Sequence, residues 1–335
     1  MSELASMLLL ENMTRRYGDL VAVEQLSFSV QRGEMFGLIG PDGAGKTTTL
    51  RVALGLLQPQ EGRVETCGMN PFRQRRRLSG KVGYLSQRFS LYGDLSVDEN
   101  IAFFADVHGV RGWKPRREEL LEMVRMAPFR ARLAERLSGG MKQKLALACT
   151  LIHTPELLIL DEPTTGVDPV SRRDFWKLLA RLQQGERGSA PALDANGLTI
   201  LLTTPYLDEA ERCQRVALID HGRLLAADQP DELRRQWPGV LIELLARPRA
   251  RAVELLRERS EVAEVESFGE RLHVTLPELE RAAAEAAARR LREALEAAGV
   301  EVEVARPTTA SLEDVFISRI RGAAPGHASP DEVSR

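Results

Sequence analysis

The chain has 335 residues, 43% of them hydrophobic and 28% charged, which is enough to form a substantial core in one large domain or two smaller ones. A formal net charge of -2 argues against binding of nucleic acid through bulk positive charge, so we expect no nucleic-acid partner. The three cysteines are far apart and odd in number, which argues against a disulfide framework or a cysteine zinc site.

The amino-terminal stretch MSELASMLLLENMTRRYG has an acid at position 3 and only a short apolar run. We therefore expect neither a signal peptide nor a membrane anchor there. Nowhere do apolar residues continue for the roughly 20 positions that a bilayer-spanning helix needs. Any membrane role would depend on another chain.

Short apolar strands alternate with helical patterns through the first two thirds of the chain, which is typical of an α/β fold with a largely parallel sheet. The predicted strands are 34–40, 81–87, 156–163 and 198–204. Residues 97–134 have helical spacing and predict a helical subdomain. Residues 183–197 are rich in turn-forming residues and predict a surface loop.

A second pattern begins at about residue 239 and predicts a small α+β domain over 239–320. The predicted order is strand 240–246, helix 249–258, strand 261–267, strand 271–276, helix 277–298, strand 300–304 and helix 309–320. This β-α-β-β-α-β order with one more helix is the ferredoxin-like arrangement. Residues 321–335 have a composition typical of a disordered tail.

The strongest chemical signal is GPDGAGKTT, which follows one predicted strand and opens a helix, as the phosphate-binding pattern G-x-x-x-x-G-K-[ST] requires. Glycines let the backbone turn tightly and bring its N–H groups onto phosphates, while the helix N-terminus favours negative charge. Lys46 would reach the β- and γ-phosphates, and the Thr47 hydroxyl would hold Mg²⁺. The residues predicted to contact ATP in this loop are Gly40, Pro41, Asp42, Gly43, Ala44, Gly45, Lys46, Thr47 and Thr48. The alternative interpretation is a glycine turn before a helix.

Two acids end the apolar strand in LLILDEP. Asp161 is predicted to contact Mg²⁺ directly or through a water, and Glu162 to polarise the water that attacks the γ-phosphate. By itself an acidic strand end is more often simply solvated. The preceding phosphate loop makes the catalytic interpretation stronger.

LSGGMKQ, residues 137–143, is a small-residue turn that opens another helix. It offers backbone N–H groups and a serine hydroxyl to a phosphate, although a simple helix cap explains it equally well in isolation. The succession of the phosphate loop, Gln87 in LSQ, LSGGMKQ, LLILDEP and Asp168 in GVD resembles the ATP-binding cassette (ABC) ATPases over about residues 7 to 230.

The resemblance implies a P-loop NTPase core over residues 7–236 that works as a dimer of cassettes with ATP and Mg²⁺. Lys46 and Glu162 would be the catalytic residues, Tyr17 would stack on adenine unless it is a core aromatic, and Gln87 would ligate Mg²⁺ beside Thr47 and Asp161. The signature residues that would act on the ATP of the opposite subunit are Ser138, Gly139, Gly140 and Gln143. Asp168 would couple the two sites across the dimer.

Pro205 departs from the family pattern. The family has a histidine that contacts the γ-phosphate after the strand that corresponds to 198–204, whereas this chain has Thr204, Pro205 and Tyr206. Proline has neither a side-chain donor nor an N–H group, so it cannot replace that contact. We therefore predict good ATP binding with reduced turnover in a homodimer. The structural alternative is that proline simply suits the end of a strand.

The stretch TTASLEDVFISRI, residues 308–320, resembles the closing motif of the extra domain on drug-resistance exporter ATPases. The same residues are compatible with a helix whose apolar side chains pack on the small domain's sheet.

We therefore expect an ATP-hydrolysing subunit of an ABC transporter, peripheral at the cytoplasmic face of the inner membrane. It would power export of a drug-like compound or ion through separate permease subunits, docked by residues 97–134 and the loop after Gln87. The second cassette would be another copy or a paralogue with an intact switch histidine. The alternatives are a non-transport ABC ATPase and a slow-hydrolysing, nucleotide-gated binding module.

Overall fold

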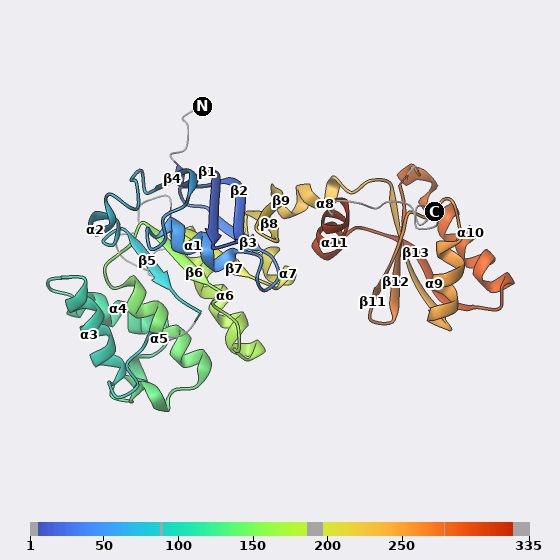
Figure 1. Cartoon of the computed structure of the whole chain (residues 1–335). Helices are drawn as coiled ribbons and strands as arrows, with labels where there is room; N and C mark the ends of the chain where they lie inside the picture. Colours follow the sequence, from blue (N-terminus) through green and yellow to red (C-terminus); the bar gives the residue numbers. More distant parts are fainter. Residues whose placement is uncertain (1–5, 88–89, 186–196, 278, 324–335) are drawn as a thin grey trace. The chain divides into compact units, whose positions relative to one another are not determined.

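The computed structural model describes residues 6–87, 90–185, 197–277 and 279–323 (Figure 1). Contacts divide the chain into two compact units, Met1–Pro230 and Asp231–Arg335, which are described separately below. The division falls before the predicted cassette end at 236, because residues that follow Pro230 lie beside strands of the second unit.

The first unit contains a six-stranded sheet in the order β5-β6-β7-β3-β8-β9, parallel except for the β8–β9 pair. Its strands are β3 (Met35–Ile39), β5 (Val82–Leu85), β6 (Leu157–Asp161), β7 (Thr199–Thr204), β8 (Arg215–Asp220) and β9 (Arg223–Asp228). Every residue of β3, β6 and β7 is buried, as expected for central parallel strands that are covered on both faces. The predicted mixed α/β architecture is confirmed.

A second, antiparallel sheet lies in the same unit, with strands in the order β2-β1-β4. These are β1 (Ser6–Tyr17), β2 (Leu20–Gln31) and β4 (Glu61–Thr66). Side chains of both sheets belong to one buried cluster, in which the rings of Phe28 and Phe36 stack 5.2 Å apart. This packing fixes the turn between β1 and β2 close to the ends of the parallel strands.

The helices of the first unit connect these strands. They are α1 (Lys46–Ala53), α2 (Arg75–Leu78), α3 (Val97–Val107), α4 (Lys114–Met123), α5 (Gly139–Leu151), α6 (Pro169–Gln184) and α7 (Leu207–Ala210). The predicted helical stretch thus contains α3 and α4, and Ser96 and Glu99 form a capping box at the start of α3. The predicted loop at 183–197 lies largely outside the described residues. No helix in the described ranges is long and apolar enough to cross a bilayer.

The second unit has a four-stranded antiparallel sheet in the order β11-β12-β10-β13. Its elements are α8 (Pro230–Arg235), β10 (Val240–Arg247), α9 (Arg249–Arg257), β11 (Glu264–Phe268), β12 (Arg271–Leu276), α10 (Ala284–Ala297), β13 (Glu301–Thr308) and α11 (Leu312–Ala323). The order from β10 to β13 is β-α-β-β-α-β, and buried residues of α9 and α10 pack with one face of the sheet.

Helix α11 is anchored to β12 and β11 of that sheet. His273 Nδ1 lies 2.7 Å from Asp314 Oδ1, and Arg321 pairs with Glu266. Leu312 and Val315 are buried, which agrees with the packing interpretation of this motif. The helix continues to Ala323, so the first residues of the predicted tail are helical, and the remainder of that tail lies outside the described residues.

Candidate functional site

The phosphate-loop sequence lies between the end of β3 and the start of α1, at the edge where the parallel strands end. Gly43 and Gly45 have φ angles of 83° and 98°, in the left-handed region that side-chain-bearing residues rarely adopt. A Cβ at Gly40 would lie 2.2 Å from the carbonyl oxygen of Ile219. These glycines are therefore needed for the turn and for its close approach to β8.

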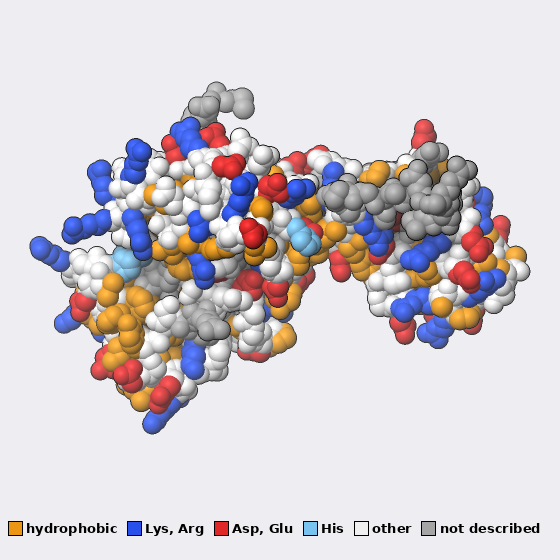
Figure 2. Space-filling model, in the orientation of Figure 1, with side chains coloured by type: hydrophobic (Ala, Val, Ile, Leu, Met, Phe, Trp, Pro, Cys, Tyr) orange, Lys and Arg blue, Asp and Glu red, His pale blue; other side chains and the backbone are white. Residues whose placement is uncertain are grey.

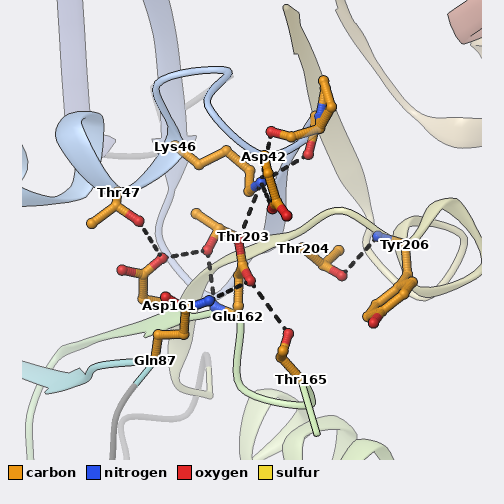
Figure 3. A network of polar contacts seen from close by, with 12 residues as sticks. Asp42, Lys46, Thr47, Gln87, Asp161, Glu162, Thr165, Thr203, Thr204 and Tyr206 are labelled. Atoms are coloured by element: carbon orange, nitrogen blue, oxygen red, sulfur yellow. Dashed lines mark hydrogen bonds and ion pairs between the residues drawn. The ribbon is translucent and has the colours of Figure 1, made fainter. Parts of the chain in front are cut away.

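Lys46 is buried, and its ammonium group is held by the loop itself. Nζ donates to the carbonyl oxygens of Gly40 at 2.8 Å and Pro41 at 3.0 Å. It also lies 3.2 Å from Glu162 Oε1 and 3.8 Å from Asp42 Oδ1 (Figure 3). The site thus holds one buried cation beside a buried carboxylate.

Asp161 ends β6 and is a hydrogen-bond acceptor for three elements. Thr47 Oγ1 donates to it at 3.2 Å, Thr203 Oγ1 at 2.8 Å and the Tyr84 hydroxyl at 3.3 Å. Burial, followed by the charge of Asp161, raises the pKa of Tyr84 to about 12, so this phenol stays protonated. Sequence reasoning did not identify Tyr84 or Thr203. Their only signal was a polar side chain near the end of a predicted strand.

Glu162 follows in a left-handed conformation, with φ of 48°. Gln87 Nε2 donates to Glu162 Oε2 at 2.8 Å. The backbone N–H of Glu162 donates to Thr203 Oγ1 at 3.0 Å. A non-glycine residue in this conformation is strained and needs surrounding contacts to hold it, which is common at functional sites. The contacts aim the carboxylate at Lys46 and Gln87 (Figure 3).

Lys46, Gln87 and Glu162 line an open pocket of about 490 Å³, whereas Asp161, which accepts from Thr47, is not on its lining. Its lining includes the predicted residues Tyr17, Asp42, Gly43, Gly45, Lys46, Thr47, Thr48, Gln87 and Glu162. The Tyr17 side chain is partly exposed, and the Arg15 guanidinium lies 4.8 Å from its ring centroid. Leu20 and Val21 at the start of β2 and His221 in the turn after β8 also line the pocket; sequence reasoning had not identified them because they lie far along the chain from the phosphate loop.

The donor set could hold a hard cation. The Thr47 hydroxyl, the Asp161 carboxylate and the Gln87 amide are oxygen donors of the kind that Mg²⁺ prefers beside phosphates. In the part of the chain that the structure describes, no group of three or more His, Cys, Asp or Glu side chains could hold a metal ion. A mixed hydroxyl, amide and carboxylate site shared with a phosphate fits this arrangement.

The signature residues do not line this pocket. Ser138 caps α5 by accepting from the Met141 N–H at 3.4 Å, and both Ser138 and Gly139 are exposed. A Cβ at Gly140 would lie 2.3 Å from Ser171 Oγ, so glycine lets α5 approach α6 closely. Hydrogen bonds from Ser171 keep the pKa of Asp168, the N-cap of α6, below its ordinary value.

Gln143 differs from the other signature residues because its side chain is buried, and neither amide atom has a hydrogen-bond partner. It does not present itself to a second chain in this structure. A surface that reaches a second chain from the start of α5 would therefore contain Ser138 and Gly139 and not Gln143.

Pro205 directly follows β7, close to the phosphate loop, because the Gly40 N–H donates to the carbonyl oxygen of Thr204 at 3.4 Å. The Thr204 hydroxyl accepts from the Tyr206 N–H at 3.0 Å and donates to Glu209 Oε2 at 2.8 Å. The Tyr206 ring points away from Lys46 and Glu162 (Figure 3). The segment 204–206 therefore lies next to the site without directing a side-chain donor at Lys46.

Comparison with known proteins gave concordant results. The family model described as ABC transporter matches residues 23–165. The probable multidrug ABC transporter ATP-binding protein YbhF of Escherichia coli K12 is 39% identical over 229 residues, which are 68% of this chain and 38% of YbhF. The chain thus spans well under half the length of that relative.

Two further matches cover most of the matched protein. The daunorubicin resistance ATP-binding protein DrrA3 of Streptomyces coeruleorubidus is 35% identical over 309 residues, which are 90% of this chain and 92% of DrrA3. The solved dimer of MJ0796, a bacterial ABC transporter cassette, matches with a TM-score of 0.56 and 25% identity over 67% of this chain and 98% of that one.

Proposed function

This chain belongs to the family of ABC transporter ATP-binding proteins, and we propose that it binds and slowly hydrolyses ATP to drive export through a separate permease. The observation that carries the proposal is the pocket in which the phosphate loop, Lys46, Gln87 and Glu162 come together, with Asp161 bonded to Thr47 of its lining. The same pocket has Tyr17 on its lining, which supports stacking on adenine.

Each group in the pocket has a role that its position supports. The N–H groups of the loop and the start of α1 would bind the phosphates, with Lys46 as their cation. Mg²⁺, when bound by Thr47, Asp161 and Gln87, would neutralise charge on the phosphates. Glu162 would accept a proton from the attacking water. A γ-phosphate bound by Lys46 would lie close to the Glu162 carboxylate, because the two side chains are 3.2 Å apart.

Slow hydrolysis is proposed because of Pro205. Loss of one transition-state donor costs about 100- to 1000-fold in turnover. The neighbouring Thr204 hydroxyl is engaged with Glu209, so it does not supply the missing donor. A nucleotide-gated binding module that scarcely hydrolyses is the second candidate, and the same proline favours it.

The cassette is proposed to act as a dimer with a second copy or with a paralogue that has an intact switch histidine. Ser138 and Gly139 are exposed at the start of α5, where they could reach the nucleotide of another subunit. A helix start with free N–H groups suits a phosphate. The dimeric MJ0796 cassette supports this arrangement.

A permease is proposed to dock on the surface formed by residues 90–96 and by α3, within the docking stretch expected from the sequence. Tyr92 and Val107 are exposed there, and Tyr92 packs 4.5 Å from the ring of Phe103. Figure 2 shows hydrophobic side chains gathered over this part of the first unit. Asn100 holds the loop to α3 through hydrogen bonds with both the N–H and the carbonyl of Tyr92. Docking there would place the chain peripherally at the cytoplasmic face of the inner membrane.

Export of a drug-like compound or ion is proposed because two relatives are named for multidrug transport and daunorubicin resistance. The alignment with DrrA3 covers 90% of this chain, which includes residues of the second unit. This supports an accessory domain over about residues 239–320 of the kind found on drug-resistance exporters.

The test is ATP binding together with multiple-turnover phosphate release by the full chain. We expect saturable, Mg²⁺-dependent binding that Lys46→Ala removes and Lys177→Ala, a change of an exposed lysine outside the pocket, leaves intact. Phosphate release should be slow but above that of Glu162→Gln. Binding with no release above that variant would favour the gating module, and absence of binding would overturn both candidates.

A further inference from the structure

Glu209 is a buried carboxylate that the roles above do not use. It lies on α7, beside Pro205, and is 1% exposed. Its Oε2 accepts from Thr204 Oγ1 at 2.8 Å, and its Oε1 accepts from Thr164 Oγ1 at 2.5 Å and from Trp176 Nε1 at 3.2 Å. Both oxygens of one carboxylate are therefore occupied by donors from three different segments.

Two of the segments that meet at Glu209 adjoin Pro205 and Glu162 in the sequence. Thr204 is the last residue of β7 and precedes Pro205, while Thr164 follows Glu162 by two positions. Trp176 and Arg172 belong to α6, and Arg172 Nε lies 3.2 Å from Glu209 Oε1. The carboxylate thus joins the strand end at Pro205 to the loop that carries Glu162.

A second set of contacts fixes the chain after Pro205. The Tyr206 N–H donates to Thr204 Oγ1, and the Glu209 N–H donates to the Tyr206 carbonyl oxygen at 3.2 Å. The Arg172 guanidinium lies 4.5 Å from the centroid of the Tyr206 ring. Through these contacts, a shift of the Glu209 carboxylate would move both sides of Pro205.

Burial of the Glu209 carboxylate is not explained by a gain in stability, because burying a charged group costs free energy. A buried ion is desolvated, and well-packed apolar residues of similar volume often stabilise a fold equally well or better. A buried, fully bonded carboxylate instead fixes the geometry of the groups that it joins.

We propose that Glu209 is a positioning residue: by bonding both Thr164 and Thr204, it holds the loop that carries Glu162 against the end of β7 for ATP hydrolysis. The inference rests on the proposed function, because it concerns the hydrolytic step of that same site. It assigns Glu209 no contact with the nucleotide. Its loss should therefore reduce the rate of hydrolysis and leave ATP affinity nearly unchanged.

The test uses single-turnover hydrolysis with protein in excess over radiolabelled ATP, together with ATP affinity and thermal unfolding. Thr204→Val and Thr164→Val each remove one hydroxyl donor to Glu209 without changing side-chain size. We expect each to lower the rate constant about 10-fold or more, since a hydrogen bond to a charged group is lost, with ATP affinity within about 2-fold. Thr204→Ser, which keeps the hydroxyl, should retain the wild-type rate.

Thr66→Val is the matched control. Thr66 is also a buried strand threonine, and its hydroxyl donates to the Ala53 carbonyl oxygen at 2.8 Å, outside the pocket. It should lose stability like the other two variants but hydrolyse at the wild-type rate. If either valine variant fails to fold, Glu209→Gln is measured instead, with the same loss of rate expected.

Equal rates for Thr204→Val and Thr66→Val, with both chains folded, would overturn the positioning role. So would a loss in ATP affinity as large as the loss in rate. Failure of the proposed function has a different signature, since the wild-type chain would then hydrolyse no faster than Glu162→Gln. That outcome also overturns the positioning role, because there would be no hydrolysis to position.

Discussion

Lys46 lies beside a carboxylate, so a γ-phosphate held by Lys46 would lie close to that negative charge. The ammonium lies 3.2 Å from Glu162, and both side chains are buried, so the pair is screened less by solvent than a surface ion pair. The Glu162 carboxylate also opposes the negative γ-phosphate. Binding of nucleotide therefore carries an electrostatic cost that depends on the charge of Glu162.

Glu162→Gln should bind ATP about 10-fold more tightly than the wild-type chain, because the amide keeps the side-chain size but removes this cost, worth about 1.4 kcal/mol. Hydrolysis should fall to background. Equilibrium binding by fluorescent ATP displacement measures the first effect, with Glu156→Gln as the control, since Glu156 pairs with Arg32 and Lys81 outside the pocket. Weaker ATP binding by Glu162→Gln would contradict this account.

Sequence reasoning at the level of single residues identified the groups that belong to a contiguous motif. Lys46, Asp161 and Glu162 each stand in such a motif, and the structure brings them together. Tyr84 and Thr203 were missed because they reach Asp161 only when β5, β6 and β7 are neighbours in the sheet. Strand order is not visible in local sequence pattern, so contacts across the sheet could not be predicted.

At the level of elements, two histidines join the ends of α3 and α5. His108 and His153 stack with ring centroids 3.9 Å apart, and His153 Nε2 lies 3.2 Å from the Val82 carbonyl oxygen. Burial, followed by the charge of His108, lowers the pKa of His153 from 6.5 to about 4. Its neutral form is therefore the one that fits the fold.

This lowered pKa predicts acid sensitivity. In the unfolded chain His153 takes up a proton as pH falls through about 6.5, whereas in the folded chain it does so only near 4. Stability from this group is therefore complete above about pH 6.5 and is lost toward pH 4, by up to about 1.4 kcal/mol per pH unit.

Urea unfolding between pH 7.5 and 4.5 measures this effect. His153→Gln should flatten the dependence of the free energy of unfolding on pH, because the group with the lowered pKa is then absent. An identical pH dependence in the wild-type chain and His153→Gln would show that another group is responsible.

Helix α11 gives a second prediction for an element. Although burial opposes it, hydrogen bonds from His273 and Ser311 keep the pKa of Asp314 below its ordinary value. Asp314→Asn should destabilise the second unit by about 1 to 3 kcal/mol, because it weakens these charged hydrogen bonds in a buried place.

Limited proteolysis and urea unfolding of the full chain measure this change. Glu313→Gln, at an exposed position on the same helix, is the control. Equal protease resistance of Asp314→Asn and Glu313→Gln would contradict an anchoring role for Asp314.

For the whole molecule, hydrophobic periodicity predicted the α/β core and the alternation of elements in the second unit well. Short, almost fully apolar stretches such as β3 and β6 are buried on both sides, as in the central strands of a sheet that is covered on both faces. The hydrophobic pattern could not show to which unit residues 230–236 belong. A short helix has the same pattern of apolar residues whichever unit it packs with. It also could not show that Gln143, within the signature stretch, is buried.

The most direct test is steady-state phosphate release by the full chain, comparing the wild type with Pro205→His. Glu162→Gln gives the background rate. A histidine at this position restores a donor beside the phosphate loop, so release should rise about 100- to 1000-fold above a slow wild-type rate. The ATP affinities of the two chains should agree within about 2-fold, since the donor acts mainly in the transition state. Brisk release by the wild-type chain, or no gain with histidine, would contradict a homodimer limited by Pro205.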